Sequence, residues 1–300
     1  IPRLRRWSPA RSAVPSRRGR AVQEITTVAA MRAFAREARE QGRRVGLVPT
    51  MGALHRGHLS LVERARAECS AVVVSIYVNP LQFGPREDFR AYPRDLERDK
   101  ELLRAAGCDV LFVPDDGEIH VPGHRTTVEV QGMQDVLCGR SRPGHFRGVT
   151  TVVAKLLAIV RPDMAYFGEK DAQQVRIIRR MAGDLHEEAR IVSCPIVREA
   201  DGLAMSSRNI YLSAEGRRAA PVLYRALGAA AALARSGETD ASRLAARVRE
   251  TIAREPLARI DYVETVDGET LEPVTTTRPG LLLAVAVWFG RARLIDNIIL

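Results

Sequence analysis

The clearest indication of the architecture comes from residues 45–58, which have the sequence VGLVPTMGALHRGH. The apolar run Val45 to Pro49 predicts a short buried strand. Leu59, Val62, Ala65 and Cys69 then recur at helical spacing, which predicts a helix. The loop between them therefore opens a helix directly after a buried strand. Its backbone amides and the helix dipole favour an anion at that edge of the sheet.

Two histidines flank a glycine in this loop, in the order His55, Gly57, His58. Glycine permits close backbone approach, and two imidazoles there donate to phosphate oxygens and stabilise charge in a phosphorus-centred transition state. The alternative is that both histidines are ordinary capping or surface residues. The strand before and the helix after favour the functional interpretation.

Working outward, strand-like and helix-like segments alternate as far as residue 197. The expected strands are 45–49, 72–78, 109–113, 164–167 and a segment near Ile191; the expected helices are 29–40, 59–69, 95–106, 149–160 and 171–181. This alternation predicts an α/β fold, a Rossmann-like parallel sheet with helices on both faces. Ligands bind such sheets beyond the carboxyl ends of the strands.

After about residue 197 the pattern changes to helices at 214–235 and 239–254, then strands at 260–266, 281–289 and 293–299. Helices followed by strands indicate a smaller α+β domain. We therefore expect a disordered basic extension over 1–23, a Rossmann-like ligand-binding domain over 24–196, and a smaller C-terminal α+β domain over 197–300 that closes over the site.

The formal net charge of +10 favours a nucleic-acid binder only at first sight. Seven arginines precede the first acidic residue, Glu24, and the rest of the chain carries only +3. We therefore expect no nucleic-acid partner; the Arg-rich start is either a disordered extension or a remnant of an organelle-targeting peptide. The longest apolar run, 281–289, is too short to cross a bilayer, so we expect no membrane partner. Four cysteines without CxxC spacing favour reduced thiols and a cytoplasmic location.

Only three of the 46 basic residues are lysines, namely Lys100, Lys155 and Lys170. A lysine kept in such an arginine-rich chain favours a position that needs a compact ammonium group. Lys170 lies in Gly168-Glu169-Lys170-Asp171, again between a strand and a helix, which suits contact with phosphates. The alternative is a charged turn.

Further candidates lie in three loops. The loop 205–209, Met-Ser-Ser-Arg-Asn, suits a clamp on a triphosphate, although such a loop by itself is more often an interdomain linker. The loop 79–84 follows a strand and offers Gln82, while Gln173 and Gln174 lie in the first turn of the next candidate helix. Residues 142–146 are interpreted as a helix entry turn. We expect no protein-bound metal, and any Mg²⁺ arrives with a nucleotide.

Together these segments closely resemble the pantothenate synthetase (pantoate–β-alanine ligase) family of the His-x-Gly-His nucleotidyltransferases, over about residues 25–299. The resemblance rests on residues 49–58, 79–83, 142–149, 167–174 and 197–209. It implies a homodimer that joins pantoate to β-alanine through a pantoyl adenylate, with ATP used as its Mg²⁺ complex and with the nucleotide and pantoate bound by the domain 24–196. An alternative is a nucleotidyltransferase of the same superfamily with a phosphate ester or nucleotide as acceptor.

The resemblance also implies roles for individual residues. Catalysis falls to His58 as proton donor, with His55 and Lys170; Gln82 and Gln174 bind pantoate, and Gln82 also binds β-alanine. ATP is bound by Met51, Gly52, Ala53, Leu54, His55, Arg56, Gly57, His58, Gly168, Glu169, Lys170, Asp171, Val197, Met205, Ser206, Ser207 and Arg208. Arg56 and Cys138 depart from the family pattern, where glutamate is frequent at both positions.

Overall fold

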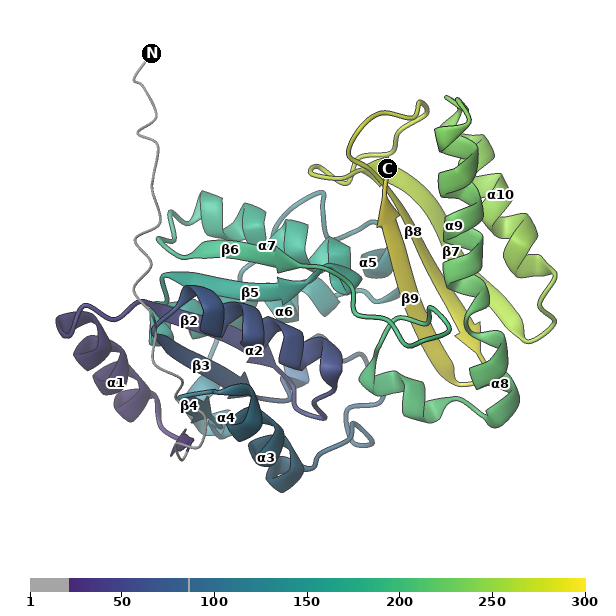
Figure 1. The fold of residues 1–300 in the computed structure, drawn as a ribbon. Coiled ribbons are helices and arrows are strands. Elements are labelled where there is room, and N and C mark those ends of the chain that lie inside the picture. The colour runs from purple at the N-terminus through teal and green to yellow at the C-terminus, as the bar shows by residue number, and fades with distance from the viewer. Residues whose placement is uncertain (1–21, 86) are drawn as a thin grey trace, which may run out of the picture.

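The computed structural model describes residues 22–85 and 87–300, which form two sheets (Figure 1). The larger sheet is parallel throughout, with strand order β1-β4-β3-β2-β5-β6. Its strands are β1 (Gln23–Ile25), β2 (Val45–Thr50), β3 (Ala71–Ile76), β4 (Val110–Phe112), β5 (Met164–Gly168) and β6 (Arg190–Cys194). The α/β class and the parallel sheet predicted from the alternation are therefore confirmed.

Helices cover both faces of this sheet, and alternating strand residues meet them. Val45, Leu47 and Val73 point to one face, and Val48, Val72 and Val74 to the other. This period of two is the side-chain alternation of a strand buried on both sides. The first face is covered by α1 (Val28–Glu40), α6 (His145–Val160) and α7 (Ala172–Asp184), and the second by α2 (Arg56–Glu68) and α3 (Leu96–Ala106).

The strand order creates a switch point between β2 and β5. From β2 the chain adds β3 and β4 on one side, then returns to add β5 and β6 on the other. Connections leave adjacent strands in opposite directions there, which opens a crevice at their carboxyl ends. The loops that follow β2 and β5 contain the two motifs richest in candidate residues.

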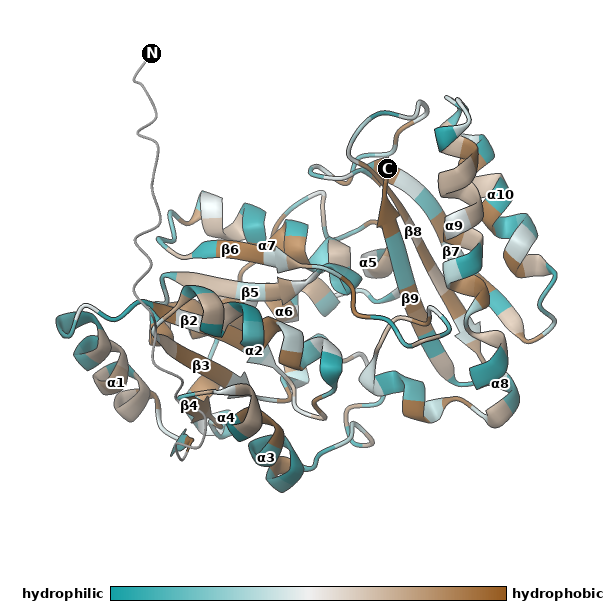
Figure 2. Ribbon diagram, in the orientation of Figure 1, coloured by the Kyte–Doolittle hydropathy of each residue, from teal (hydrophilic) through white to brown (hydrophobic). Residues whose placement is uncertain are grey.

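The second sheet is antiparallel and has three strands, β7 (Ala258–Asp267), β8 (Leu281–Phe289) and β9 (Ala292–Ile299). Leu281, Leu283 and Val285 of β8 pack with α9 (Val222–Arg235) and α10 (Ala241–Ala253). Leu282 and Ala284 on its other face join the core of the parallel sheet. Burial on both faces explains the unbroken apolar run of β8, which is brown in Figure 2.

Several bounds differ from the prediction by a few residues, as in α6, which begins at His145 and not at residue 149. Two further differences affect how the chain is divided. The helix expected over 214–235 is split into α8 (Ala214–Ala219) and α9, because Pro221 has no amide hydrogen and its ring conflicts with the preceding helical turn. Gln23, assigned to the extension, is already the first residue of β1. Residues 1–21 of that extension lie outside the described residues.

Two smaller features complete the sheet domain. The short helices α4 (Asp116–Ile119) and α5 (Cys138–Ser141) were not predicted.

Among the helices of the described residues, none has the length and apolarity needed to cross a membrane.

Candidate active site

The loop after β2 is built around two histidines at the start of α2. The Nδ1 atom of His55 accepts a hydrogen bond from the Gly57 amide at 3.1 Å. The Nδ1 atom of His58 accepts one from the His55 amide at 3.3 Å. Because Nδ1 accepts in both rings, each neutral imidazole carries its proton on Nε2, away from the backbone. A Cβ on Gly57 would lie 2.9 Å from the His55 ring, so the glycine makes room for it.

Both rings are neutral at pH 7. Burial, followed by the positive charge of Lys170, lowers the pKa of His55 to about 4. Burial, then His55 and Lys170, lowers the pKa of His58 to about 3. The arrangement therefore offers two Nε2–H hydrogen-bond donors. It does not offer an imidazolium acid in the absence of ligand.

The loop after β2 is anchored by a buried carboxylate, Asp99, that was not among the sequence candidates. Asp99 of α3 is 1% exposed and accepts the Leu54 amide at 2.8 Å. Burial raises the pKa of Asp99, and hydrogen bonds from the amides of Leu54 and Ala53 oppose that rise. Ala53 has a φ of 51°, a conformation that such anchoring offsets. Nothing in the sequence signals this role, since Asp99 lies between charged neighbours in a surface-like helix.

Lys170 lies at the carboxyl end of β5. Its Nζ is 3.2 Å from a carboxylate oxygen of Asp171, and the side chain is 20% exposed. Asn297 of β9 donates to the carbonyl groups of Glu169 and Lys170 at 2.9 and 3.1 Å, which ties this loop to the antiparallel sheet. The Glu169 carboxylate instead pairs with Arg176 of α7.

A third loop, residues 205–208, also lines the crevice. Arg208 forms a two-point ion pair with Asp88, with N–O distances of 3.1 and 3.0 Å. The Ser207 hydroxyl lies 3.3 Å from that of Tyr92. Asp88 and Tyr92 belong to the segment after the 3₁₀ turn Pro80–Gln82 and were not among the sequence candidates.

The three motifs line one cavity of about 220 Å³. Among the candidates, those that line it are Met51, His55, Gly57, His58, Gln82, Gly168, Lys170, Asp171, Gln174, Val197, Met205, Ser206, Ser207 and Arg208. Five candidates do not: Gly52, Ala53, Leu54, Arg56 and Glu169. Leu54 is buried in the core under α2, and Arg56 pairs with Glu63 at the surface.

The two adjacent glutamines have different surroundings. Gln174 faces the cavity. Gln173 is buried; it accepts the Cys138 amide at 3.0 Å and donates to the carbonyl groups of Met133 and Val136 at 3.0 and 2.8 Å. Gln173 thus fixes a neighbouring loop.

Arg142 and His145, interpreted from sequence as an entry turn, contact Gln82. His145 has its Nδ1 2.8 Å from the Gln82 carbonyl oxygen, which makes Nδ1 the donor. Its Nε2 then accepts from Arg142 at 3.0 Å, and Arg142 is also paired with Glu87 at 2.6 Å. Burial, followed by the charge of Arg142, lowers the pKa of His145 to about 3.

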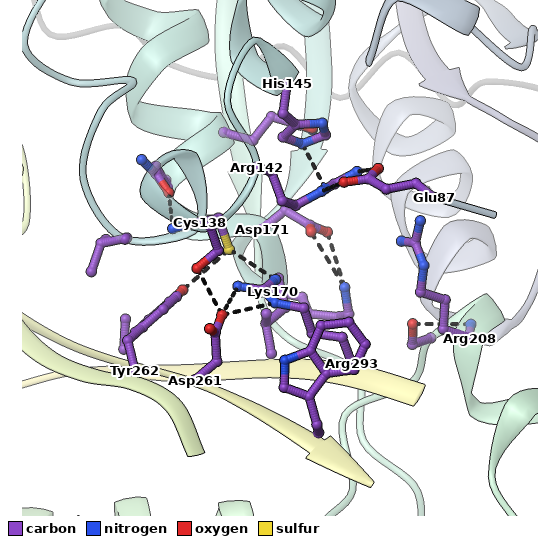
Figure 3. A pocket seen from close by; sticks show the side chains of 18 of the residues that line it. Glu87, Cys138, Arg142, His145, Lys170, Asp171, Arg208, Asp261, Tyr262 and Arg293 are labelled. Carbon is purple, nitrogen blue, oxygen red and sulfur yellow. Dashed lines mark hydrogen bonds and ion pairs between the residues drawn. The ribbon is translucent and has the colours of Figure 1, made fainter. Parts of the chain in front are cut away.

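A larger cavity of about 1070 Å³ adjoins the first and shares Arg142, His145, Lys170 and Arg208 with it (Figure 3). Its far wall belongs to the antiparallel sheet. Cys138 of α5 faces that wall, with its Sγ 3.2 Å from the hydroxyl of Tyr262 in β7 and 3.5 Å from Arg293 in β9. All four cysteines are free and buried. The described residues contain no cluster of three or more His, Cys, Asp or Glu side chains suited to a metal.

Comparison with known proteins shows the family of this chain. A family model described as pantoate-beta-alanine ligase matches residues 23–299. The pantothenate synthetase of Heliobacterium modesticaldum is 57% identical over 275 residues, which are 92% of this chain and 98% of that protein. The Acetivibrio thermocellus pantothenate synthetase is 54% identical over the same shares.

Solved structures give the same result. Pantothenate synthetase from Thermus thermophilus superposes with a TM-score of 0.88 at 50% identity, covering 92% of this chain and 99% of that one. A pantoate-beta-alanine ligase from Francisella tularensis, complexed with beta-gamma ATP and beta-alanine, superposes with a TM-score of 0.77 at 33% identity, covering 93% of this chain and 98% of that one. By the family model, the sequence identity and the shared architecture, this chain belongs to the pantoate–β-alanine ligase family.

Proposed function

We propose that this protein condenses pantoate with β-alanine at the expense of ATP, giving pantothenate, AMP and pyrophosphate. A carboxylate resists attack by an amine, so it must first be activated. A pantoate carboxylate oxygen attacks the α-phosphorus of ATP, and the bond to the bridging oxygen breaks to release pyrophosphate. The β-alanine amine then attacks the acyl carbon of the adenylate, loses a proton, and AMP leaves.

The observation that carries this proposal is the convergence of three separate motifs on one cavity at the sheet's switch point. The Nε2–H groups of His55 and His58 supply donors for phosphate oxygens, and Lys170 supplies a positive charge. Charge that develops on those oxygens in the transition state is stabilised most where the donors are already oriented. Because His58 is neutral, its contribution is hydrogen-bond donation.

The remaining roles follow from polarity. Ser206, Ser207 and Arg208 suit the phosphate chain of the nucleotide, with Mg²⁺ entering as part of the ATP complex. Gln82 and Gln174 have uncharged amides, which suit the hydroxyl and carboxylate oxygens of pantoate; Gln82 then also orients β-alanine. The larger cavity beside the motifs gives the second substrate and the products a route, and closure of the segment 197–300 over it would exclude water.

The experiment is exchange of labelled pyrophosphate into ATP in the absence of β-alanine. The ligase reaction predicts exchange that depends on pantoate, followed by release of AMP when β-alanine is added. A dinucleotide-type product without pantoate dependence would instead identify the alternative acceptor class.

Three further properties of the family-based interpretation remain predictions. They are a homodimer, a cytoplasmic location and the absence of nucleic-acid binding. Light scattering coupled to gel filtration measures the first. For the third, a nucleic-acid binder would keep its salt-dependent affinity for DNA or RNA after removal of the Arg-rich start.

A further inference from the structure

Lys155 is a lysine that the proposed chemistry leaves unused. Lys170 lines the cavity, and Lys100 pairs with Glu24 and Glu97. Lys155 lies on α6, where its Nζ donates to the Ile119 carbonyl at 2.7 Å and to Nδ1 of His120 at 3.3 Å. Within the described part of the chain this ammonium group forms no ion pair with a carboxylate.

An ammonium group only donates, so its contact fixes the tautomer of His120. Nδ1 of His120 must present its lone pair to Lys155, and the ring proton therefore resides on Nε2. Nε2 lies 3.2 Å from Oδ1 of Asn79 and donates to it. Burial, followed by Lys155 and His124, lowers the pKa of His120, and Asp116 raises it, which is consistent with a neutral ring.

Asn79 is 1% exposed, and each end of its amide has a partner of one polarity. Its Oδ1 accepts from His120 and from the Leu81 amide at 3.3 Å. Its Nδ2 donates to the Gly148 carbonyl at 3.0 Å and to Oε1 of Gln82 at 3.2 Å. Gly148 permits this contact, since a Cβ there would meet the Leu81 carbonyl oxygen at 2.3 Å.

With Oε1 of Gln82 occupied by Asn79, its NH₂ group is turned to the cavity, where it lies 3.0 Å from the sulfur of Met51. We propose that Lys155 and His120 are positioning residues that fix the polarity of the Gln82 amide through Asn79. The cavity thereby offers a donor to an acceptor oxygen of the hydroxy-acid substrate. This inference rests on the proposed function and names how that site selects an acceptor.

Four variants test the relay in the full chain: His120→Leu, His120→Gln, Lys155→Met and Lys100→Met. Glutamine keeps a donor near the position of the imidazole Nε2, whereas leucine does not. We expect His120→Leu and Lys155→Met to raise KM for pantoate about tenfold and to leave KM for ATP within about twofold, as expected for one misdirected hydrogen bond. We expect His120→Gln and the surface control Lys100→Met to remain within about threefold of the parent for pantoate.

A purely structural role would predict equal effects of leucine and glutamine, or equal rises in both KM values; either result overturns the inference, as does an unchanged KM for pantoate in Lys155→Met. The ¹⁵N shifts of the His120 ring give a readout that needs no substrate. The relay predicts the Nε2–H tautomer in the parent. An Nδ1–H tautomer in the parent overturns the relay. A parent that makes no pantothenate overturns only the proposed function.

Discussion

The ring centroids of His55 and His58 lie 4.1 Å apart in the first turn of α2, and both rings use Nδ1 to accept a backbone amide of that turn. Helix capping thus uses the Nδ1 edge of each ring and leaves the Nε2–H edge for the proposed contact with phosphate. The interpretation of these histidines as helix caps and their interpretation as phosphate ligands are compatible, because one edge satisfies the helix and the other is left for substrate.

Removing the His58 imidazole or the Lys170 ammonium group should lower the reaction rate strongly and change the stability of the fold little. We expect His58→Ala and Lys170→Ala each to lower kcat by about two to four orders of magnitude, the range for a preorganised group acting on transition-state charge. Steady-state rates with saturating substrates measure this. Thermal unfolding midpoints close to the parent's serve as the control, and near-parental rates would refute these role assignments.

Acid should destabilise the protein through its buried neutral histidines. The pKa values of His58 and His145 are about 3 in the folded state against 6.5 for an ordinary histidine. The unfolded chain therefore binds these protons first, and the free energy of unfolding falls as pH drops below about 6.5, by up to about 1.4 kcal/mol per pH unit for each histidine.

Denaturant unfolding between pH 4 and 7 compares the parent with His145→Gln. The variant should show a shallower loss of stability toward acid, because one titrating group is gone. The matched control is His186→Gln at an exposed position, which should follow the parent. Identical slopes for all three proteins would contradict the assignment of His145 as a buried neutral ring.

Asp99 should matter for both stability and activity. Replacing it with alanine leaves the amides of Leu54 and Ala53 unpaired under α2, at a cost of about 1–3 kcal/mol for a buried group. We expect a lower unfolding midpoint and a reduced kcat. Asp95→Asn is the matched control: Asp95 is the N-cap of the same helix, and asparagine caps equally well. Parental values for Asp99→Ala would show that the loop does not depend on this anchor.

The pair between Arg208 and Asp88 should compete with nucleotide. Arg208 cannot neutralise a phosphate while both of its contacting nitrogens are bound to a carboxylate. Asp88→Asn is therefore expected to lower KM for ATP about two- to fivefold, in line with the modest strength of a partly exposed pair. Arg208→Ala should raise it. A higher KM for ATP in Asp88→Asn would mean that Asp88 orients Arg208 for binding instead of withholding it.

Most helices and strands could be predicted from the periodicity of apolar residues. The β-branched run that forms β3, the apolar run of β8 and the helical spacing in α6 all predict their elements, because burial on a sheet or beneath a helix imposes its period on the sequence. Short elements such as β1 and α5 are too brief to show a period, and their formation depends on packing with distant segments.

The site was predictable where a motif lies at the end of a strand. That His55, His58 and Lys170 lie at one edge of the sheet could be predicted because strand, loop and helix follow one another in the sequence. The choice between Gln173 and Gln174 could not be made from spacing alone, since neighbouring helix positions differ only in what packs beside them. Asp99 and the partner of Arg208 depend on tertiary contacts between segments far apart in the chain, which no local pattern reports.

The most direct measurement follows the oxygen atoms of the substrate carboxylate. Pantoate labelled with ¹⁸O in its carboxyl group is converted with ATP and β-alanine, and the AMP formed is analysed by mass spectrometry. If the carboxylate attacks the α-phosphorus in the cavity between His58 and Lys170, AMP carries one ¹⁸O atom from each labelled pantoate. AMP free of label, with pantothenate still formed, would contradict the acyl-adenylate route.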